Sequence, residues 1–309
     1  MTETPTVIPP TGRAILWMTP RMISTAFAKC MSGIADCEVW FEPFVFCHVA
    51  AAAMVAEGIR EVPMSYEGNE REFGSISSKV AEMIASTNVV PERLAFATIQ
   101  KRLEDSPSRY VFSKDESIAM FSESRRQYLP KGYRHAFIIR HPRLVYDSFR
   151  KAAFRASKLN GILKYNETED TFDLRNYGDG FDVADTFRHH HDFWQYIRQN
   201  VDPSPLVISS EDLLNNPEKI LPKFCEAMGY PYSESLLSWN ASPDVIKTWK
   251  WPTAQEFSNP SFLDTSIKST HFVSPKPVPA WEDLTEDIRE MAKNAMPFYE
   301  EMYIHRLIV

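Results

Sequence analysis

The sequence predicts an α/β fold, in which helices cover both faces of an open parallel sheet and so form three layers. Short apolar runs of strand length alternate along the chain with amphipathic helical patterns, the order expected for a parallel sheet. The runs lack the polar alternation of a strand with one solvated face, so we expect strands that are covered on both sides. These runs are residues 13–18, 109–113, 135–139 and 205–209.

Helical patterns follow three of these strands, at residues 24–31, 142–159 and 217–228. Pro142 and Pro217 stand near helix starts, where a missing N–H costs little, and Gly229 suits the end of the last helix. Ligands of such sheets bind beyond the carboxyl ends of the strands, so we expect the functional residues there.

The composition excludes several classes of protein. Hydrophobic residues make up 44% of the 309 and charged residues 24%, which excludes a disordered chain. A net charge of −7 argues against a nucleic-acid partner, which requires a broad basic face. The longest apolar run, residues 41–56, is too short and too polar for a bilayer span of about 20 residues.

Cysteine usage and the first residues indicate the compartment. The 4 cysteines form no CxxC pair, which predicts free thiols in a reducing environment. The first residues show no basic segment followed by an apolar core, as a signal peptide would. We therefore expect a cytoplasmic protein that does not enter a membrane.

The chain is expected to form one domain over residues 1–309, because no repeat or Gly/Ser linker divides it. Residues 1–12 are predicted to be a flexible N-terminus. Residues 245–280 are rich in Pro, Ser and Thr and are predicted to form a lid or substrate-binding region. The sequence leaves the oligomeric state open, and a homodimer is compatible with it.

The first strand turns directly into a helix through residues suited to an anion. Backbone N–H groups at a helix start, together with the helix dipole, favour negative charge, and an Arg adds a fixed positive charge. The loop lacks the GxxxxGK[ST] pattern of ordinary ATP and GTP sites. The alternative is a plain N-cap, Ser24 or Thr25, beside a surface Arg. The segment comprises Pro20, Arg21, Met22, Ile23, Ser24, Thr25 and Ala26.

A second anion site is predicted after the third strand. Arg140 stands at the strand end and Ser148 lies eight residues later, on the following helix. Both side chains could reach one phosphate. A solvated Arg beside a helix start is the alternative.

Together these segments resemble the sulfotransferases that use 3′-phosphoadenosine 5′-phosphosulfate (PAPS). That family carries a Pro-Arg/Lys-x-x-Ser/Thr-Thr turn for the 5′-phosphosulfate, matched here by residues 20–25. Its RxP…S element for the 3′-phosphate has the same eight-residue step as Arg140 and Ser148. A third match, residues 208–213 with 216–217 and 228–231, is similar to a structural stretch of the family. The resemblance implies a P-loop NTPase-like sulfotransferase fold and a divergent branch of the family.

The chain departs from the family at two places. Met22 and Ile23 replace the usual Ser-Gly of the phosphosulfate turn. The Arg-Lys-Gly element of the cytosolic members is absent, and Lys268, Ser269 and Thr270 lie in roughly the right place to substitute for it.

The resemblance implies sulfuryl transfer to a hydroxyl or amine of a small-molecule acceptor. By analogy with phosphoryl transfer, catalysis needs a cation near the leaving phosphate and a base for the acceptor proton. Arg21 is the first candidate for the cation and Lys114, at the end of the second strand, is the second. For the base we rank Glu42 first, because aromatic residues flank it and relatives place a Glu in a comparable segment. His48 ranks second and Asp115 third.

Two other functions remain as alternatives. A nucleotide kinase would need a Walker Lys, which is missing, and a non-catalytic nucleotide sensor would bind without turnover. No metal is predicted: three consecutive residues, His189, His190 and His191, point in different directions on a helix.

Overall fold

The structure is a computed structural model that describes residues 12–83, 89–159, 161–177, 182–242, 244–252, 266 and 268–309. Among these residues, one sheet is formed with the strand order β2-β3-β1-β4-β5. All four pairings between neighbouring strands are parallel. The strands are β1 (Arg13–Met18), β2 (Cys37–Phe41), β3 (Tyr110–Glu116), β4 (Arg134–Ile139) and β5 (Leu206–Ser209). The predicted α/β class with an open parallel sheet is confirmed.

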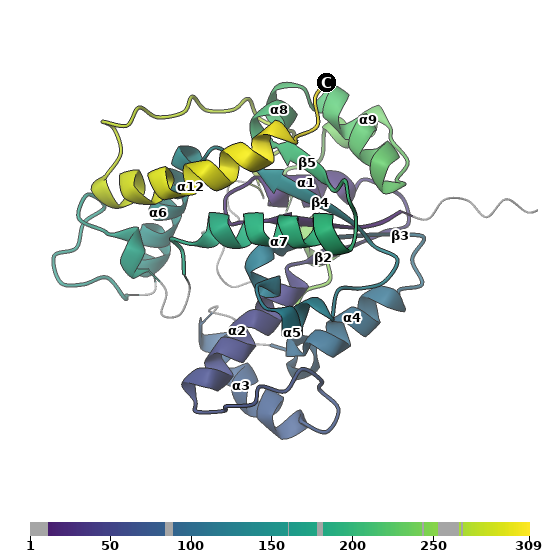
Figure 1. Ribbon diagram of the computed structural model, residues 1–309, viewed down its shortest axis with the longest axis vertical. Helices are drawn as coiled ribbons and strands as arrows, with labels where there is room; N and C mark the ends of the chain where they lie inside the picture. Colours follow the sequence, from purple (N-terminus) through teal and green to yellow (C-terminus); the bar gives the residue numbers. More distant parts are fainter. Residues whose placement is uncertain are drawn as a thin grey trace, which may run out of the picture.

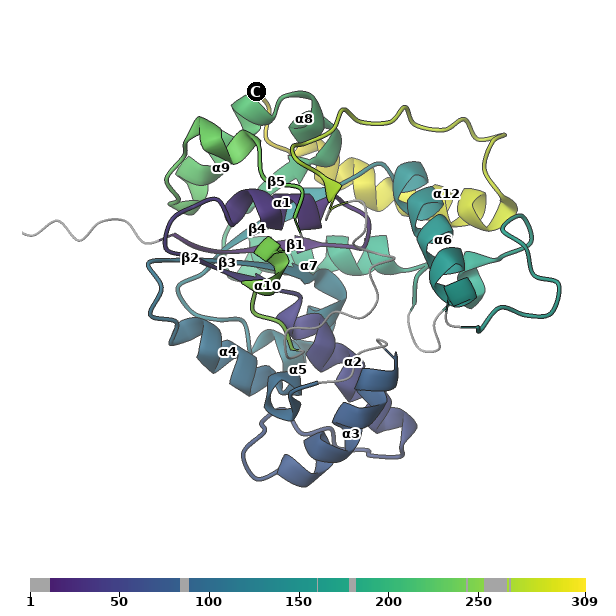
Figure 2. The same cartoon turned by 180° about the vertical axis from the view of Figure 1, so that it is seen from behind.

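Helices connect the strands and cover both faces of the sheet (Figures 1 and 2). The α-helices are α1 (Ser24–Met31), α2 (Pro43–Ala56), α3 (Glu70–Met83), α4 (Phe96–Glu104), α5 (Glu123–Arg126), α6 (Pro142–Leu159), α7 (Thr186–Asn200), α8 (Ser210–Asn215), α9 (Pro217–Met228), α10 (Asp244–Lys247) and α12 (Glu286–Ile304). Short 3-10 helices occupy η1 (Pro91–Leu94), η2 (Ser117–Met120), η3 (Leu174–Asn176) and η4 (Glu234–Leu237).

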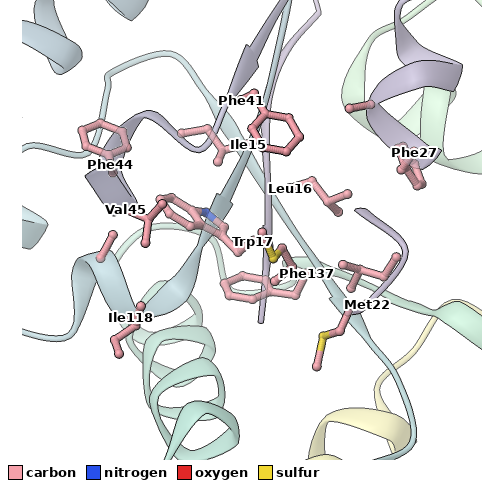
Figure 3. Close-up of a cluster of buried hydrophobic side chains, with 14 of the residues drawn as sticks. Ile15, Leu16, Trp17, Met22, Phe27, Phe41, Phe44, Val45, Ile118 and Phe137 are labelled. Carbon is pink, nitrogen blue, oxygen red and sulfur yellow. The ribbon is translucent and has the colours of Figure 1, made fainter. Parts of the chain in front are cut away.

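Aromatic contacts show which helices lie on which face. On one face, Phe27 of α1 packs against Phe112 of β3 and Phe224 of α9, with ring centroids 5.8 and 4.7 Å apart. On the other face, Trp17 of β1 lies 6.5 Å from Phe44 of α2 and 4.8 Å from Phe193 of α7. Figure 3 shows Trp17 and Phe27 on opposite sides of β1. The core therefore has two apolar layers, one on each face of the sheet.

One strand was not predicted from the sequence. β2 has the sequence CEVWF, in which Glu38 interrupts the apolar run. The Glu38 carboxylate accepts hydrogen bonds from Trp40 Nε1 and Ser106 Oγ at 2.7 and 2.9 Å. Because β2 is the edge strand of the sheet, a polar residue is tolerated there, and this obscured the pattern.

The second predicted strand, residues 109–113, ends too early. β3 continues to Glu116, so that Lys114, Asp115 and Glu116 belong to the strand. Side chains alternate along a strand, which places Lys114 and Glu116 on the α1 face and Asp115 on the α2 face. This extension brings three consecutive ionisable residues to the carboxyl edge of the sheet.

The apolar run of residues 41–56 ends β2 and then forms α2, whose side chains are mostly buried. Among the described residues, no helix has the length and apolar character that a membrane crossing requires. Parts of two predicted segments, residues 1–11 of the N-terminus and residues 253–265 and 267 of the lid, lie outside the described residues. Within the described part of the lid segment, Trp249 and Trp251 stack on Phe41 at 5.1 and 4.1 Å.

Buried histidines make the stability of this fold depend on pH. His135 of β4 accepts a hydrogen bond from Trp17 Nε1 at 2.9 Å, and burial lowers the pKa of His135 to about 4 from its usual value near 6.5. Between these pH values the unfolded chain binds a proton at His135 that the folded chain does not. The contribution of His135 to folding is therefore complete above pH 6.5 and is lost progressively as the pH falls to about 4.

We expect His135→Gln to flatten this pH dependence by about 1.4 kcal/mol per pH unit near pH 5, as one fewer proton is taken up on unfolding. Urea unfolding of both proteins at pH 5 and pH 7 measures the difference. An unchanged slope would show that His135 is not held neutral in the folded state.

Candidate functional site

The turn between β1 and α1 has an unusual backbone. Arg21 and Ile23 have φ values of 73° and 58°, in the left-handed region that residues other than Gly rarely adopt. Such strain persists only where the surrounding structure enforces it, and it is frequent at functional sites. Ile23 is the N-cap of α1 and makes no side-chain capping bond, so the alternative of a plain Ser24 or Thr25 N-cap is wrong.

Neighbouring elements hold this turn through its carbonyl groups. Arg140 Nη1, just after β4, donates to the Arg21 carbonyl at 2.8 Å. Ser210 Oγ, at the start of α8, donates to the carbonyl of the buried Met22 at 3.2 Å. Two adjacent peptide units are thus fixed from the β4 and β5 side of the sheet.

Positive charge gathers beside the turn. Arg21 Nε donates to Ser148 Oγ of α6 at 3.1 Å. Burial, followed by the nearby guanidinium groups of Arg140 and Arg155, lowers the pKa of Arg21 to about 10. Burial also lowers the pKa of Arg140. Like charges held together in a partly desolvated place make binding of a multivalent anion favourable.

A buried ion pair lies on the other side of the turn. Lys114 Nζ of β3 is 2.6 Å from Glu42 Oε1, and the two side chains are 2% and 19% exposed. The ammonium also donates to Ser24 Oγ and Thr25 Oγ1 at 3.3 and 3.4 Å. Lys114 therefore connects Glu42 with the first residues of α1.

The backbone fixes the position of Glu42. It occupies the junction of β2 and α2 with a φ of 54°, and its N–H donates to the Lys114 carbonyl at 2.8 Å. The Phe41 ring lies under Lys114 Nζ, with 3.8 Å from the nitrogen to the ring centroid. The main chain and the side chain of Glu42 are thus both hydrogen-bonded to Lys114.

The side chain of Asp115, the third-ranked base, is occupied by main-chain N–H groups. Its carboxylate accepts hydrogen bonds from the N–H groups of Phe44 and Val45 at 2.6 and 3.0 Å, which caps the start of α2. Burial raises the pKa of Asp115 to about 8 against the effect of these hydrogen bonds. Both of its oxygens point to the α2 face, opposite to Lys114.

His48, the second-ranked base, lies in the second turn of α2 and contacts Arg125. The distance from Arg125 Nη1 to His48 Nδ1 is 2.5 Å. Burial, followed by the Arg125 charge, lowers the pKa of His48 to about 3. The structure does not bring His48 into contact with Lys114 or Glu42.

The segment proposed to replace the Arg-Lys-Gly element is attached to α1. Lys29 Nζ, buried in α1, donates to the carbonyls of Ser266 and Ser269 at 3.1 and 3.0 Å. Trp239 Nε1 donates to Ser269 Oγ at 3.2 Å, and the Trp239 N–H donates to the Thr270 carbonyl. Lys268 itself is exposed.

Three residues of this region were missed in the sequence, namely Arg155, Ser210 and Lys29. Arg155 had a detectable signal, because it lies seven residues after Ser148 and so on the same face of α6. The other two act through contacts between distant segments, which no local pattern reveals.

Other candidate sites lie apart from this edge. Within the described part of the chain, no cluster of three or more His, Cys, Asp or Glu side chains could hold a metal ion. His190 contacts Ser117 Oγ at 2.7 Å, whereas His191 contacts Glu301 at 2.9 Å, so the consecutive histidines do point in different directions. A cavity of about 670 Å³ beside β2 and α4 is lined by none of the predicted site residues.

Comparison with known proteins agrees with the resemblance in the sequence. Residues 199–306 match the family model described as a sulfotransferase domain, which confirms the resemblance to sulfotransferases and supports a transferase of that kind. The matched region begins after the β1–α1 turn and Arg140, and of the predicted site residues it contains only Lys268, Ser269 and Thr270. A search of the curated proteins found no significant match.

Solved structures were also compared. The sulfotransferase domain from the curacin biosynthetic pathway shares 13% identity, with a TM-score of 0.41 and coverage of 94% of this chain and 98% of that one. The sulfotransferase domain of the Synechococcus PCC 7002 olefin synthase shares 16%, with a TM-score of 0.41 and coverage of 95% and 98%. Mouse sulfotransferase SULT7A1 complexed with PAP shares 13%, with a TM-score of 0.40 and coverage of 95% and 83%.

Substitutions of Lys114 and Glu42 should have non-additive effects on the free energy of unfolding, because the two side chains form an ion pair. Glu42→Gln leaves the buried Lys114 ammonium without a counter-charge, and we expect it to cost about 3 kcal/mol, the low end for buried pairs since Glu42 retains some solvent. The double variant Lys114→Met, Glu42→Gln removes both charges and should recover most of this loss. Urea unfolding of the single and double variants measures the coupling, and additive losses would contradict it.

Proposed function

We propose that this chain, with its match to the sulfotransferase domain, transfers a sulfuryl group from PAPS to a hydroxyl or amine of a small molecule. The observation that carries the proposal is the strained β1–α1 turn, which has an arginine cluster on one side and the Lys114–Glu42 pair on the other. One side suits the phosphates of a nucleotide, and the other supplies a cation and a carboxylate.

The residues of the site fit a donor with two phosphate positions. Arg140 and Ser148, which meet Arg21, would hold the 3′-phosphate. The N–H groups at the start of α1, with Ser24 and Thr25, would hold the 5′-phosphosulfate. In this proposal PAPS is also contacted by Lys268, Ser269 and Thr270, whose segment is positioned by Lys29. PAPS supplies the sulfuryl group.

The transfer step assigns a role to each charged side chain. The bond between the acceptor oxygen or nitrogen and sulfur forms while the bond from sulfur to the phosphate oxygen breaks. Arg21 and Lys114 stabilise the charge that moves to the phosphate. Glu42 takes the acceptor proton on Oε2, since Oε1 is held by Lys114. Glu42 ranks above His48, which is a weak base beside Arg125.

Ligand binding tests the donor. We expect adenosine 3′,5′-bisphosphate (PAP) to raise the melting temperature of the protein, because it binds only the folded state, and ATP to have no comparable effect. Arg140→Ala should abolish the PAP shift, whereas the exposed Arg188→Ala on α7 should preserve it. A shift with ATP and none with PAP would overturn the proposed donor.

Turnover tests the base. Glu42→Gln should retain the PAP-induced shift but lose sulfuryl transfer from PAPS to a panel of phenols and amines by about a hundredfold or more, the usual contribution of a general base. Product formation is followed with labelled PAPS, and the exposed Glu226→Gln serves as control. A fully active Glu42→Gln enzyme would contradict the assignment of Glu42, even if the donor is correct.

A further inference from the structure

Glu116, the last residue of β3, has a buried carboxyl oxygen that lacks a partner in the part of the chain that the structure describes. The residue is 8% exposed, and its Oε2 has no hydrogen bond among the described residues. Buried polar atoms are nearly always paired in folded proteins, because an unpaired one forfeits its hydration. A buried carboxyl oxygen without a partner at the carboxyl edge of the sheet therefore indicates that a ligand supplies its hydrogen-bond donor.

The position of Glu116 places it beside the proposed site of transfer. It lies two residues after Lys114 on the same face of β3, and in the register of the sheet it pairs with Met18 of β1. Thr19, the residue that follows β1, also has a buried hydroxyl without a partner among the described residues. Unpaired polar atoms thus occur at the ends of both central strands.

The charges around Glu116 are unbalanced. Burial raises the pKa of Glu116 well above its usual range; Glu42 and Asp115 raise it further, and Lys114 opposes them. Glu42 and Glu116 thus share one face with a single ammonium, because Asp115 lies on the opposite face, and that ammonium is already bound to Glu42 at 2.6 Å. The arginine cluster contacts Ser148 and the β1–α1 turn instead. A second cation would give Glu116 the counter-charge that Lys114 gives to Glu42.

We propose that Glu116 is a specificity residue that binds a cationic group of the acceptor, so that the acceptor class is a small hydroxyl- or amine-bearing molecule with a protonated amine beside its reacting atom. This inference rests on the proposed function. An ammonium supplies the N–H donor that Oε2 lacks, together with the positive charge that lets the Glu116 carboxyl release its proton to solvent. A neutral hydroxyl supplies only the hydrogen bond.

Three phenols that differ in charge test the inference: tyramine, 4-ethylphenol and 3-(4-hydroxyphenyl)propionate. Binding of each is measured by calorimetry to the full chain, with and without PAP. Tyramine should bind at least about tenfold more tightly than 4-ethylphenol, the factor expected for a charge-assisted hydrogen bond, and the propionate most weakly.

Substitutions assign the preference to Glu116. Glu116→Gln keeps the shape and removes the charge, and Glu116→Met removes all polarity. Both should reduce the preference for tyramine to within about threefold of 4-ethylphenol, while the exposed Glu226→Gln should leave it unchanged. The melting temperature of each variant verifies that it is folded. If Glu116→Gln does not fold, Glu116→Met alone is used for the comparison.

Equal or tighter binding of 4-ethylphenol would overturn the inference, as would undetectable binding of tyramine or an intact preference in both Glu116 variants. PAP binding, measured in the same experiments, separates this outcome from the proposed function. Absence of the charge preference in the unsubstituted protein, with PAP binding intact, contradicts only the acceptor class, whereas absence of PAP binding contradicts the donor.

Discussion

The Lys114 ammonium is the point on which the site depends. A buried lysine is stable only when opposite charge and hydrogen-bond acceptors surround it. Lys114 finds a carboxylate in Glu42, hydroxyls in Ser24 and Thr25, and the face of the Phe41 ring. These partners come from the end of β2 and the start of α1. Their need to converge on one nitrogen fixes how the two segments meet at the edge of β3.

Strain in the backbone accompanies this convergence. Arg21, Ile23 and Glu42 all have positive φ, and all lie where a strand passes into a helix. Each such residue costs of order 1–3 kcal/mol and needs compensation from its surroundings. The bonds from Arg140 to the Arg21 carbonyl and from the Glu42 N–H to the Lys114 carbonyl supply part of it. The strained residues are held because the strands that precede them, β1 and β2, lie in a largely buried sheet.

The local charge beside the β1–α1 turn differs in sign from the net charge of the protein. A net charge of −7 argues against a negatively charged polymer as partner but not against a small anion, because Arg21, Arg140 and Arg155 meet at one place. Across the turn the balance reverses, with the carboxyl groups of Glu42 and Glu116 on the same face as the single ammonium of Lys114. Neighbouring regions of opposite character suit a reaction between an anionic donor and an acceptor that is not anionic.

Local patterns determined much of this protein. The runs of β1, β4 and β5 and the helices α1, α6 and α9 were predictable, because burial on both faces and Pro and Gly at helix ends leave marks in a short window. Local spacing also singled out Arg21, Arg140 and Ser148, and the structure brings Arg140 and Ser148 each into contact with Arg21, while their role in binding stays a prediction.

Only the tertiary structure decided the rest. β2 is hidden in the sequence by Glu38, whose partners are supplied by the fold. Asp115 and Glu116 are neighbours in sequence, yet Asp115 caps α2, while Oε2 of Glu116 on the opposite face has no partner within the described part of the chain. The pairing of Glu42 with Lys114 joins residues 72 positions apart. Such contacts depend on strand order and on which face each residue occupies, and no local pattern records either.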